Sequence, residues 1–335
     1  MNYNSRPFFG LMKNLRYPEA FQGNLKKNNY YEGWYNKIVD VKKDKSYAFI
    51  PTIAINRESN TSQAFIQILN GQTGEMHYIR HKLTKFENLS NTEFSIRIDN
   101  SYFSAQGFLL DIDQNGIKIK GNIKYINPIL WPRSFLQPNI MGILNYIPFL
   151  ETYHGIVSMN HKLIGSLDIN GTIVDFNGGK GYVEKDWGSS FPESYIWAQT
   201  NHFLETELSM VLSVALVPLF GVKIKGFFCV IWHKGTFYTF TTYTNAKVRF
   251  LSRSGKNIRL VIEDRKYFVD ITIDKSNLKF TKLKAPKLGD MSFDIVETLS
   301  SRIKVHLYDR KNHKVILEDT GTNAGLDIYN IDLLK

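Results

Sequence analysis

Apolar and polar residues alternate along most of this 335-residue chain. A period of two is typical of β-strands that bury one face. The dipeptide Asn-Gly separates alternating runs at residues 70–71, 115–116 and 170–171. Both central positions of a type I′ turn need a positive φ, which Asn and Gly adopt readily, so each dipeptide predicts a tight hairpin. The pattern therefore predicts a meander of antiparallel strands.

These strands predict a mainly β fold made of two barrels. Many amphipathic strands with few helices favour closed or nearly closed barrels, because closure removes exposed strand edges. A barrel of about eight strands encloses one small apolar ligand, and two such units account for the chain length. The high aromatic content, 14% of the residues, supports strands as well. The one helix that we expect covers residues 289–300, where the alternation weakens.

A proline-rich apolar segment interrupts the strands at residues 128–150. Its four prolines break regular structure, yet the segment stays apolar. A solvated linker would be polar, so we expect this one to cover an apolar surface or to cross between two barrels. It divides the chain into a predicted N-terminal domain, 1–127, and a predicted C-terminal domain, 151–335.

Composition excludes several classes of protein. The net charge of +11 suits contact with an anionic surface, such as lipid headgroups. The basic residues are scattered, however, and no zinc-finger spacing appears, so we do not expect a nucleic-acid partner. The single Cys229 excludes an intramolecular disulfide framework. His77 and His81 are four residues apart, but their surroundings are strand-like, so we interpret this spacing as chance. No EF-hand loop appears, and we predict no metal site.

The sequence also lacks the signs of a secreted or membrane-spanning protein. The first residues hold no apolar core of secretory length. The longest apolar run, residues 208–222, is short and is broken by Pro218 and Gly221. We therefore expect a cytoplasmic protein, with peripheral contact to an anionic membrane surface.

Candidate catalytic residues are concentrated in residues 178–203. If this stretch is extended, Glu184 and Asp186 share one face and Lys185 points the other way. Two neighbouring carboxylates repel each other, so one of them tends to keep a proton, as a general acid must. The alternative is that Lys185 and other bases neutralise both carboxylates at the surface.

The second half of this stretch carries a candidate binding surface. Trp197, Gln199 and Asn201 occupy alternate positions and form an aromatic floor with two amides. Such a set suits a ligand with an aromatic or polyene part and a few hydroxyl groups. It is harder to explain as core, because buried amides need hydrogen-bond partners.

A second candidate acid lies in the aromatic motif at residues 30–35. On an extended strand Glu32 and Trp34 share a face, and Tyr35 points the other way. A carboxyl group among apolar rings has its ionised form disfavoured, which would make Glu32 a proton donor. The alternative is a solvated Glu32 at a barrel rim.

Several motifs in this order resemble the tocopherol cyclase family, which is related to the lipocalin-like carotenoid hydratases. They are Pro18-Glu-Ala-Phe-Gln-Gly23, Asn28-Asn-Tyr-Tyr-Glu-Gly-Trp-Tyr-Asn-Lys37, Gly181-Tyr-Val-Glu-Lys-Asp-Trp-Gly-Ser-Ser-Phe-Pro192 and Trp197-Ala-Gln199. The plant pattern has Asn where this chain has Asp186. Glu184 therefore carries over from the family directly, and Asp186 does not.

The resemblance implies two lipocalin-like β barrels and a cofactor-free reaction on a prenylated hydroquinone. In that reaction, an intramolecular isomerisation, an acid protonates an alkene to a tertiary cation, and the phenol oxygen captures the cation to close a chroman ring. Protonation of an alkene needs an undissociated acid in a water-poor pocket, and aromatic faces stabilise the cation.

We assign roles to the candidate residues on this basis. Glu184 or Asp186 is the proton donor, with Glu32 as a further catalytic candidate. The residues that would contact the hydrophobic isoprenoid substrate are Trp34, Tyr35, His154, Trp187, Trp197, Gln199 and Asn201. Two alternatives stay open: a non-catalytic carrier of a hydrophobic isoprenoid, and a hydratase in which water captures the same cation.

Overall fold

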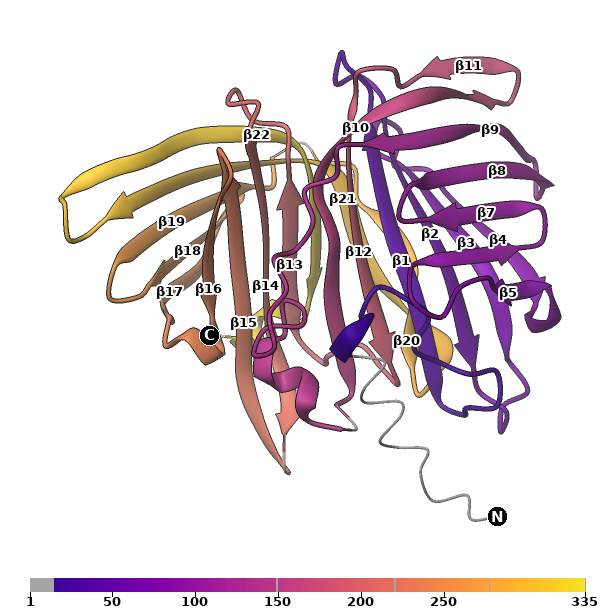
Figure 1. The fold of residues 1–335 in the computed structure, drawn as a ribbon, viewed down its shortest axis with the longest axis horizontal. Helices are drawn as coiled ribbons and strands as arrows, with labels where there is room; N and C mark the ends of the chain where they lie inside the picture. The colour runs from indigo at the N-terminus through magenta and orange to yellow at the C-terminus, as the bar shows by residue number, and fades with distance from the viewer. Residues whose placement is uncertain (1–14, 149, 220, 277, 335) are drawn as a thin grey trace. The chain divides into compact units, whose positions relative to one another are not determined.

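The structure is a computed structural model that describes residues 15–148, 150–219, 221–276 and 278–334 (Figure 1). The chain forms two compact units, each built on its own antiparallel sheet. The first unit comprises residues up to Leu69, Glu75–Phe191 and Lys284–Asp294; the second comprises Asn70–Gly74, Pro192–Leu283 and Ile295 onward. The predicted mainly β fold of antiparallel strands is confirmed. The closure of the strands into two barrels stays a prediction.

Among the described residues, the first unit holds a 12-stranded sheet in the order β4-β3-β2-β1-β12-β10-β9-β8-β7-β6-β5, with β11 paired to β10. Its strands are β1 (Tyr30–Val39), β2 (Ser46–Ile55), β3 (Gln63–Asn70), β4 (Met76–Lys82), β5 (Phe86–Asn88), β6 (Ser95–Ile98), β7 (Ser101–Ser104), β8 (Gly107–Gln114), β9 (Ile117–Ile126), β10 (Thr152–Ile169), β11 (Thr172–Asp175) and β12 (Lys180–Gly188). Strand β12 lies between β1 and β10, which places residues 30–39 and 180–188 side by side (Figure 1).

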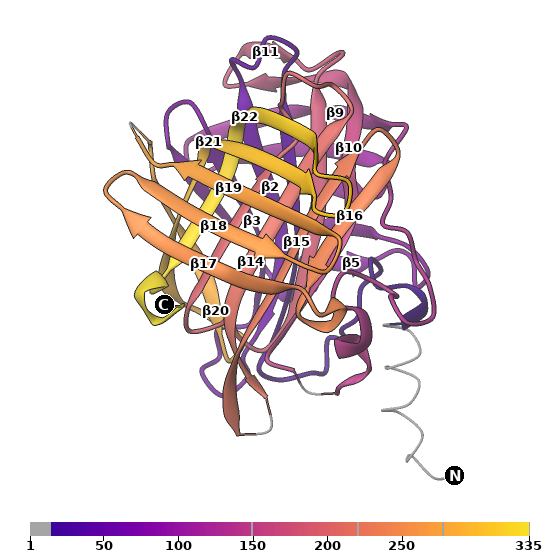
Figure 2. The ribbon, with the colours of Figure 1, turned by 90° about the vertical axis from the view of Figure 1, so that its left-hand side faces the viewer.

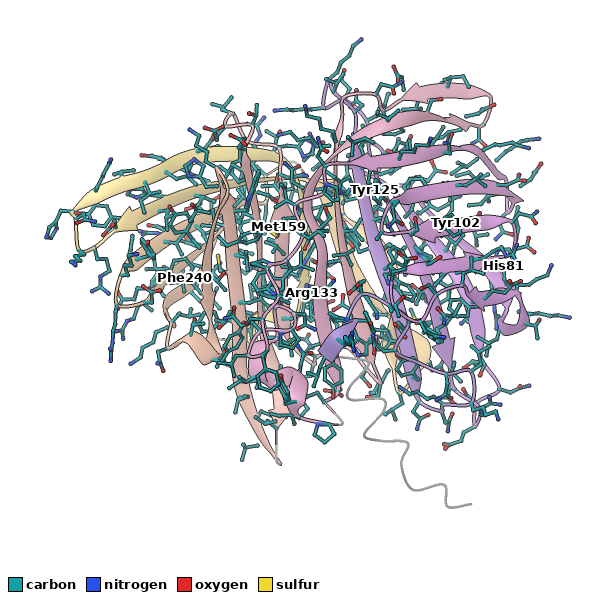
Figure 3. The ribbon with its side chains drawn as sticks, in the orientation of Figure 1. His81, Tyr102, Tyr125, Arg133, Met159 and Phe240 are labelled. Carbon is teal, nitrogen blue, oxygen red and sulfur yellow. The ribbon has the colours of Figure 1, made fainter. Side chains whose placement is uncertain are left out.

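The second unit holds a 10-stranded sheet, counted over the same described residues, in the order β16-β15-β14-β13-β22-β21-β19-β18-β17, with β20 paired to β21. Its strands are β13 (Tyr195–Thr200), β14 (Leu208–Leu219), β15 (Val222–His233), β16 (Thr236–Thr241), β17 (Lys247–Ser254), β18 (Asn257–Glu263), β19 (Tyr267–Asp274), β20 (Thr281–Lys287), β21 (Asp290–Asp309) and β22 (Lys314–Tyr329). Hydrophobic side chains of the second unit form one buried cluster, which includes Phe240 (Figure 3).

The described helices are short 3-10 turns: η1 (Leu83–Lys85), η2 (Gly142–Tyr146), η3 (Thr242–Thr244) and η4 (Ile331–Leu334). None of the helices in the described residues is long and apolar enough to cross a membrane. The expected helix over residues 289–300 is wrong, because strand β21 begins at Asp290 and pairs with β19 and β22. Pairing with neighbouring strands outweighs the weak local pattern there.

Two of the three Asn-Gly dipeptides form the predicted hairpins. Asn115 and Gly116 both have positive φ between β8 and β9, and so do Asn170 and Gly171 between β10 and β11. The third dipeptide differs, because the connection after Asn70 is longer and its positive φ falls on Gly74. The Asn70 side chain instead accepts hydrogen bonds from backbone amides at residues 72 and 73, as in an Asx turn.

The proline-rich segment covers a strand of the first unit. It connects β9 to β10, and both strands belong to the 12-stranded sheet. Ile129 exchanges backbone hydrogen bonds with Met159 and Asn160 of β10, and Arg133 forms an ion pair of 2.6 Å with Glu19 (Figure 3). The first unit continues past this segment to Phe191. Strands β10 and β12, which follow the segment, pair with each other inside the first unit's sheet and so belong to that unit.

Candidate functional site

Strand β12 carries the candidate acids at the centre of the first unit's sheet. Glu184 lies opposite Tyr35 of β1 and Ile156 of β10, and Asp186 lies opposite His154 of β10. Residues directly opposite each other on paired strands point to the same face of a sheet. The register therefore brings Glu184, Asp186, His154 and Tyr35 to one face, as the alternation predicted for the two acids.

His154 lies between the two carboxylates. Its Nδ1 is 2.8 Å from an oxygen of Asp186, and its Nε2 is 3.2 Å from an oxygen of Glu184. His154 and Glu184 are buried, whereas the side chain of Asp186 keeps 28% of its exposure. We call these three residues the His154 cluster.

The two carboxylates control the charge of the imidazole. Burial lowers the pKa of His154, but the negative charges and hydrogen bonds of Asp186 and Glu184 outweigh it and raise the pKa to about 10. At neutral pH the cluster thus holds an imidazolium between two carboxylates. The repulsion that was expected to leave a proton on one acid is offset by a proton on His154.

Tyr182 and Lys37 complete this face. The Tyr182 hydroxyl donates a hydrogen bond of 2.6 Å to Glu184. Burial and the neighbouring charge of Glu184 raise the pKa of Tyr182 well above its usual value, so it stays a donor. Lys37 is fully buried and lies opposite Tyr182 in the register of β1 and β12. A buried lysine thus shares the face of the His154 cluster.

The opposite face of β12 carries a different buried ion pair. Lys185 lies 2.6 Å from Glu32, and both side chains are fully buried. Glu32 also accepts hydrogen bonds from the Tyr30 hydroxyl at 2.5 Å and from the backbone amides of Gln22 and Gly23 at 2.8 and 2.9 Å. All of these partners are donors, which suits a carboxylate. The expected role of Glu32 as proton donor stays a prediction.

Lys185 ties the segment before β1 to the sheet. Its ammonium donates to the carbonyls of Pro18 and Ala20, and it lies over the rings of Trp34 and Trp187 at 5.2 and 4.4 Å. We call Lys185, Glu32 and the backbone that they bind the Lys185 clamp. Its charged groups are buried and hydrogen-bonded, which is typical of groups that stabilise a fold.

The predicted tryptophans of the first unit, Trp34 and Trp187, contact Lys185 of this clamp. Trp34 stacks on Phe94 with ring centroids 5.0 Å apart, and Trp187 stacks on Tyr153 at 5.4 Å. Both lie on the face of the sheet opposite to the His154 cluster, because they alternate with Tyr35 and Asp186 along their strands. Their assignment to the substrate's path stays a prediction.

The remaining predicted residues lie in the second unit. Trp197 and Gln199 are buried on β13 opposite Ser213 and Val211 of β14, and buried Asn201 follows the end of β13. A hydrogen bond of 2.7 Å between Tyr195 and Asp327 makes this face of β13 polar as well. The expected alignment of the two strand positions is present, and the binding role of all three residues stays a prediction.

The sequence analysis did not include Tyr182 or Lys37 in the site, and it did not predict the buried ion pair of Lys185 with Glu32. Tyr182 precedes Glu184 by two residues, so the alternation along β12 could have placed it on the same face. Lys185 meets Glu32 because β1 pairs with β12. These strands are far apart in the sequence, and no local pattern encodes their pairing.

The His154 cluster is also the place where a cation could be held. Its three side chains each offer one ligand atom, and these atoms lie within 4.8 Å of one another. A metal ion would compete with the proton of His154, because an imidazole that binds a metal is neutral. The expectation of no metal site stays a prediction.

Comparison with known proteins places this geometry in a family. Tocopherol cyclase, chloroplastic, of Zea mays is 23% identical over 207 residues, and probable tocopherol cyclase, chloroplastic, of Oryza sativa subsp. japonica is 23% identical over 201 residues. The matched part is 57% of this chain and 42% of each relative, so the chain spans less than half of their length.

Solved structures show the same fold at lower identity. Kievitone hydratase from Nectria haematococca matches with a TM-score of 0.52 and 12% identity, over 90% of this chain and 89% of the other. CghA with Sch210972 matches with a TM-score of 0.55 and 9% identity, over 90% and 88%. The tocopherol cyclase-like family model matches residues 74–329, which include the whole His154 cluster. The chain belongs to the tocopherol cyclase-like family, as the motifs predicted.

Proposed function

We propose that this protein is an enzyme that cyclises a prenylated hydroquinone to a chroman by acid catalysis. The observation that carries the proposal is the His154 cluster, a buried set of one imidazolium and two carboxylates. Membership of the tocopherol cyclase-like family supports an enzyme of this kind. The Lys185 clamp has no group free for this chemistry, so the other face of β12 is the better candidate.

Burial distinguishes Glu184 as the proton donor that we propose. An apolar substrate displaces water from the site, and an alkene is protonated only where water is scarce. Glu184 is more buried than Asp186, with 5% against 28% of its side chain exposed, so we assign the proton transfer to Glu184. The imidazolium then stabilises the carboxylate that forms when Glu184 gives the proton up.

The reaction returns this proton at its end. Glu184 protonates one carbon of the substrate's alkene, and the tertiary cation forms at the other carbon. The phenol oxygen bonds to the cation, and the phenol proton goes back to Glu184, so the substrate and product are isomers. Tyr35, opposite Glu184, offers an aromatic ring to the cation.

The direct test is turnover in deuterated water. The purified chain, given a prenylated hydroquinone in detergent micelles, should yield an isomer of the substrate that keeps one carbon-bound deuterium after it is returned to ordinary water. A product heavier by one water would show a hydratase instead. Saturable binding without any product would show a carrier, and either result overturns the proposal.

Variants test the assignment of the donor. Glu184→Gln should lower turnover by about hundredfold or more, the usual contribution of a general acid. Asp186→Asn should have a smaller effect, because Asp186 orients the imidazolium without touching the alkene. Asp113→Asn, an exposed carboxylate of the same unit, is the matched control and should turn over like the wild type. Equal turnover of Glu184→Gln and the control would contradict the assignment.

A further inference from the structure

The hairpin formed by β14 and β15 ends in a two-stranded ribbon, to which no third strand pairs among the described residues. Strand β13 pairs with β14 only as far as Ala215, and β16 pairs with β15 only from Phe228. Within the described residues, the strand partners of Val217–Leu219 and Val222–Ile224 are one another. Figures 1 and 2 both show this hairpin running beyond the strands beside it.

One face of this ribbon is aliphatic. Val217 lies opposite Ile224 and Leu219 lies opposite Val222, so their four side chains share a face. None of the four is fully buried, and Val222 is 61% exposed. Phe220 lies between them in the sequence, outside the described residues. A two-stranded ribbon with such a face is marginal in water, and exposed apolar groups of this kind mark an interaction site.

The other face and the surrounding sequence are basic. Lys223 and Lys225 alternate with the aliphatic residues, and both are exposed. Lys223 forms an ion pair of 2.7 Å with Glu193; both side chains are exposed, so lipid headgroups can compete for the lysine. The whole stretch Leu208–Ile262 contains no Asp or Glu. Its basic residues are Lys223, Lys225, Lys234, Lys247, Arg249, Arg253, Lys256 and Arg259. A surface of this charge repels a second copy of itself and attracts an anionic partner.

We propose that the end of the β14–β15 hairpin, residues 217–219 and 222–225, docks on an anionic lipid bilayer. The aliphatic face enters the boundary between headgroups and acyl chains, and the two lysines bind the headgroups. An apolar face beside basic residues is the combination that gives stable but reversible binding to such surfaces. The docking site is independent of the reaction proposed above, and its test contains no substrate.

Co-sedimentation with vesicles tests the docking. The full chain should bind vesicles made of equal amounts of phosphatidylcholine and phosphatidylglycerol, and should bind pure phosphatidylcholine vesicles far more weakly. Equal binding to both, or no binding to either, would overturn the proposal.

Two double variants separate the two parts of the surface. Lys223→Gln with Lys225→Gln should weaken binding to the anionic vesicles about tenfold to thirtyfold. Leu219→Asn with Val222→Asn should weaken it about tenfold or more. The controls are Ile173→Asn, 65% exposed in the other unit, and Lys118→Gln with Lys120→Gln. Variants that bind like these controls would contradict the assignment, as would a variant that changes only the oligomeric state in gel filtration.

A thiol probe checks the fold and the depth together. The chain has one cysteine, Cys229, and it is buried, so Val222→Cys adds the accessible thiol. A polarity-sensitive dye at this position should shift to shorter wavelength with anionic vesicles, whereas the same dye on Ile173→Cys should not. An unshifted dye at position 222, on protein that sediments with the vesicles, would place the docking surface elsewhere.

Discussion

On one face of β12, Lys185 and Glu32 form an ion pair that is surrounded by donors and carbonyls; on the other face, His154 lies between two carboxylates. Both sets are buried, and both join β12 to its neighbours. They differ in their titratable groups. The Lys185 clamp pairs one ammonium with one carboxylate, whereas in the His154 cluster two carboxylates share the imidazole of His154.

This difference separates stability from chemistry on neighbouring residues of one strand. A buried ion pair with all its hydrogen bonds satisfied fixes a conformation, here that of the segment before β1. A set of coupled titratable groups can take up and release a proton near neutral pH, which is what a general acid requires. Three predictions can break or sharpen this comparison.

The largest effect is expected from Lys185→Met. The change removes the cation and leaves Glu32 as a buried charge without its counter-ion, which should cost about 3–5 kcal/mol of unfolding free energy. Urea unfolding followed by tryptophan fluorescence measures the loss. Lys118→Met, an exposed lysine paired with Asp113, is the control and should lose about 0–1 kcal/mol. Equal losses in the two variants would show that the clamp has no structural role.

The next effect is a pH dependence that His154→Gln should remove. The pKa of His154 is raised from 6.5 to about 10 in the folded protein, so its contribution to stability is full below pH 6.5 and is lost as the pH rises towards 10. Wild-type unfolding free energy should therefore fall across this window, and that of the variant should fall less. The charged neighbours Glu184 and Asp186 cause the shift. Parallel pH profiles for the two proteins would contradict the charge state given for the cluster.

Some of this arrangement could be predicted from the sequence alone. The alternation of Glu184, Lys185 and Asp186 between two faces was predicted correctly, because side-chain direction along a strand is a local property. The mainly β fold and the family followed from the same local patterns and motifs. The catalytic and binding roles of the residues stay predictions.

The partners across strands could not be predicted. His154 meets Asp186 through a register between β10 and β12 that shifts twice, between Ile156 and Ser158 and between Ser158 and His161. Such irregularities change which residues lie opposite each other, and sequence alternation does not reveal them. Gly181 is a further example: a Cβ there would lie 2.2 Å from Nε2 of His161, a contact that is visible only once the strands are paired.

The smallest effect comes from a matched pair of tyrosines, one on each face. Tyr30 donates to Glu32 at 2.5 Å and Tyr182 donates to Glu184 at 2.6 Å, and each acceptor is a buried carboxylate. Tyr30→Phe and Tyr182→Phe should each lose about 1.5 kcal/mol of unfolding free energy, since each removes one hydrogen bond to a charged group.

Turnover should distinguish the two tyrosine variants. Removal of the Tyr182 hydroxyl leaves the Glu184 carboxylate with one donor fewer. The alkaline limb of the pH–rate profile, where a general acid loses its proton, should therefore move to higher pH, and turnover should change with it. Tyr30→Phe should keep the wild-type profile, because Glu32 retains Lys185 and two backbone donors. A shift of the profile in Tyr182→Phe alone would support a catalytic proton on the face of the His154 cluster. Equal shifts in both variants would contradict the assignment of catalysis to one face of β12 and of stability to the other.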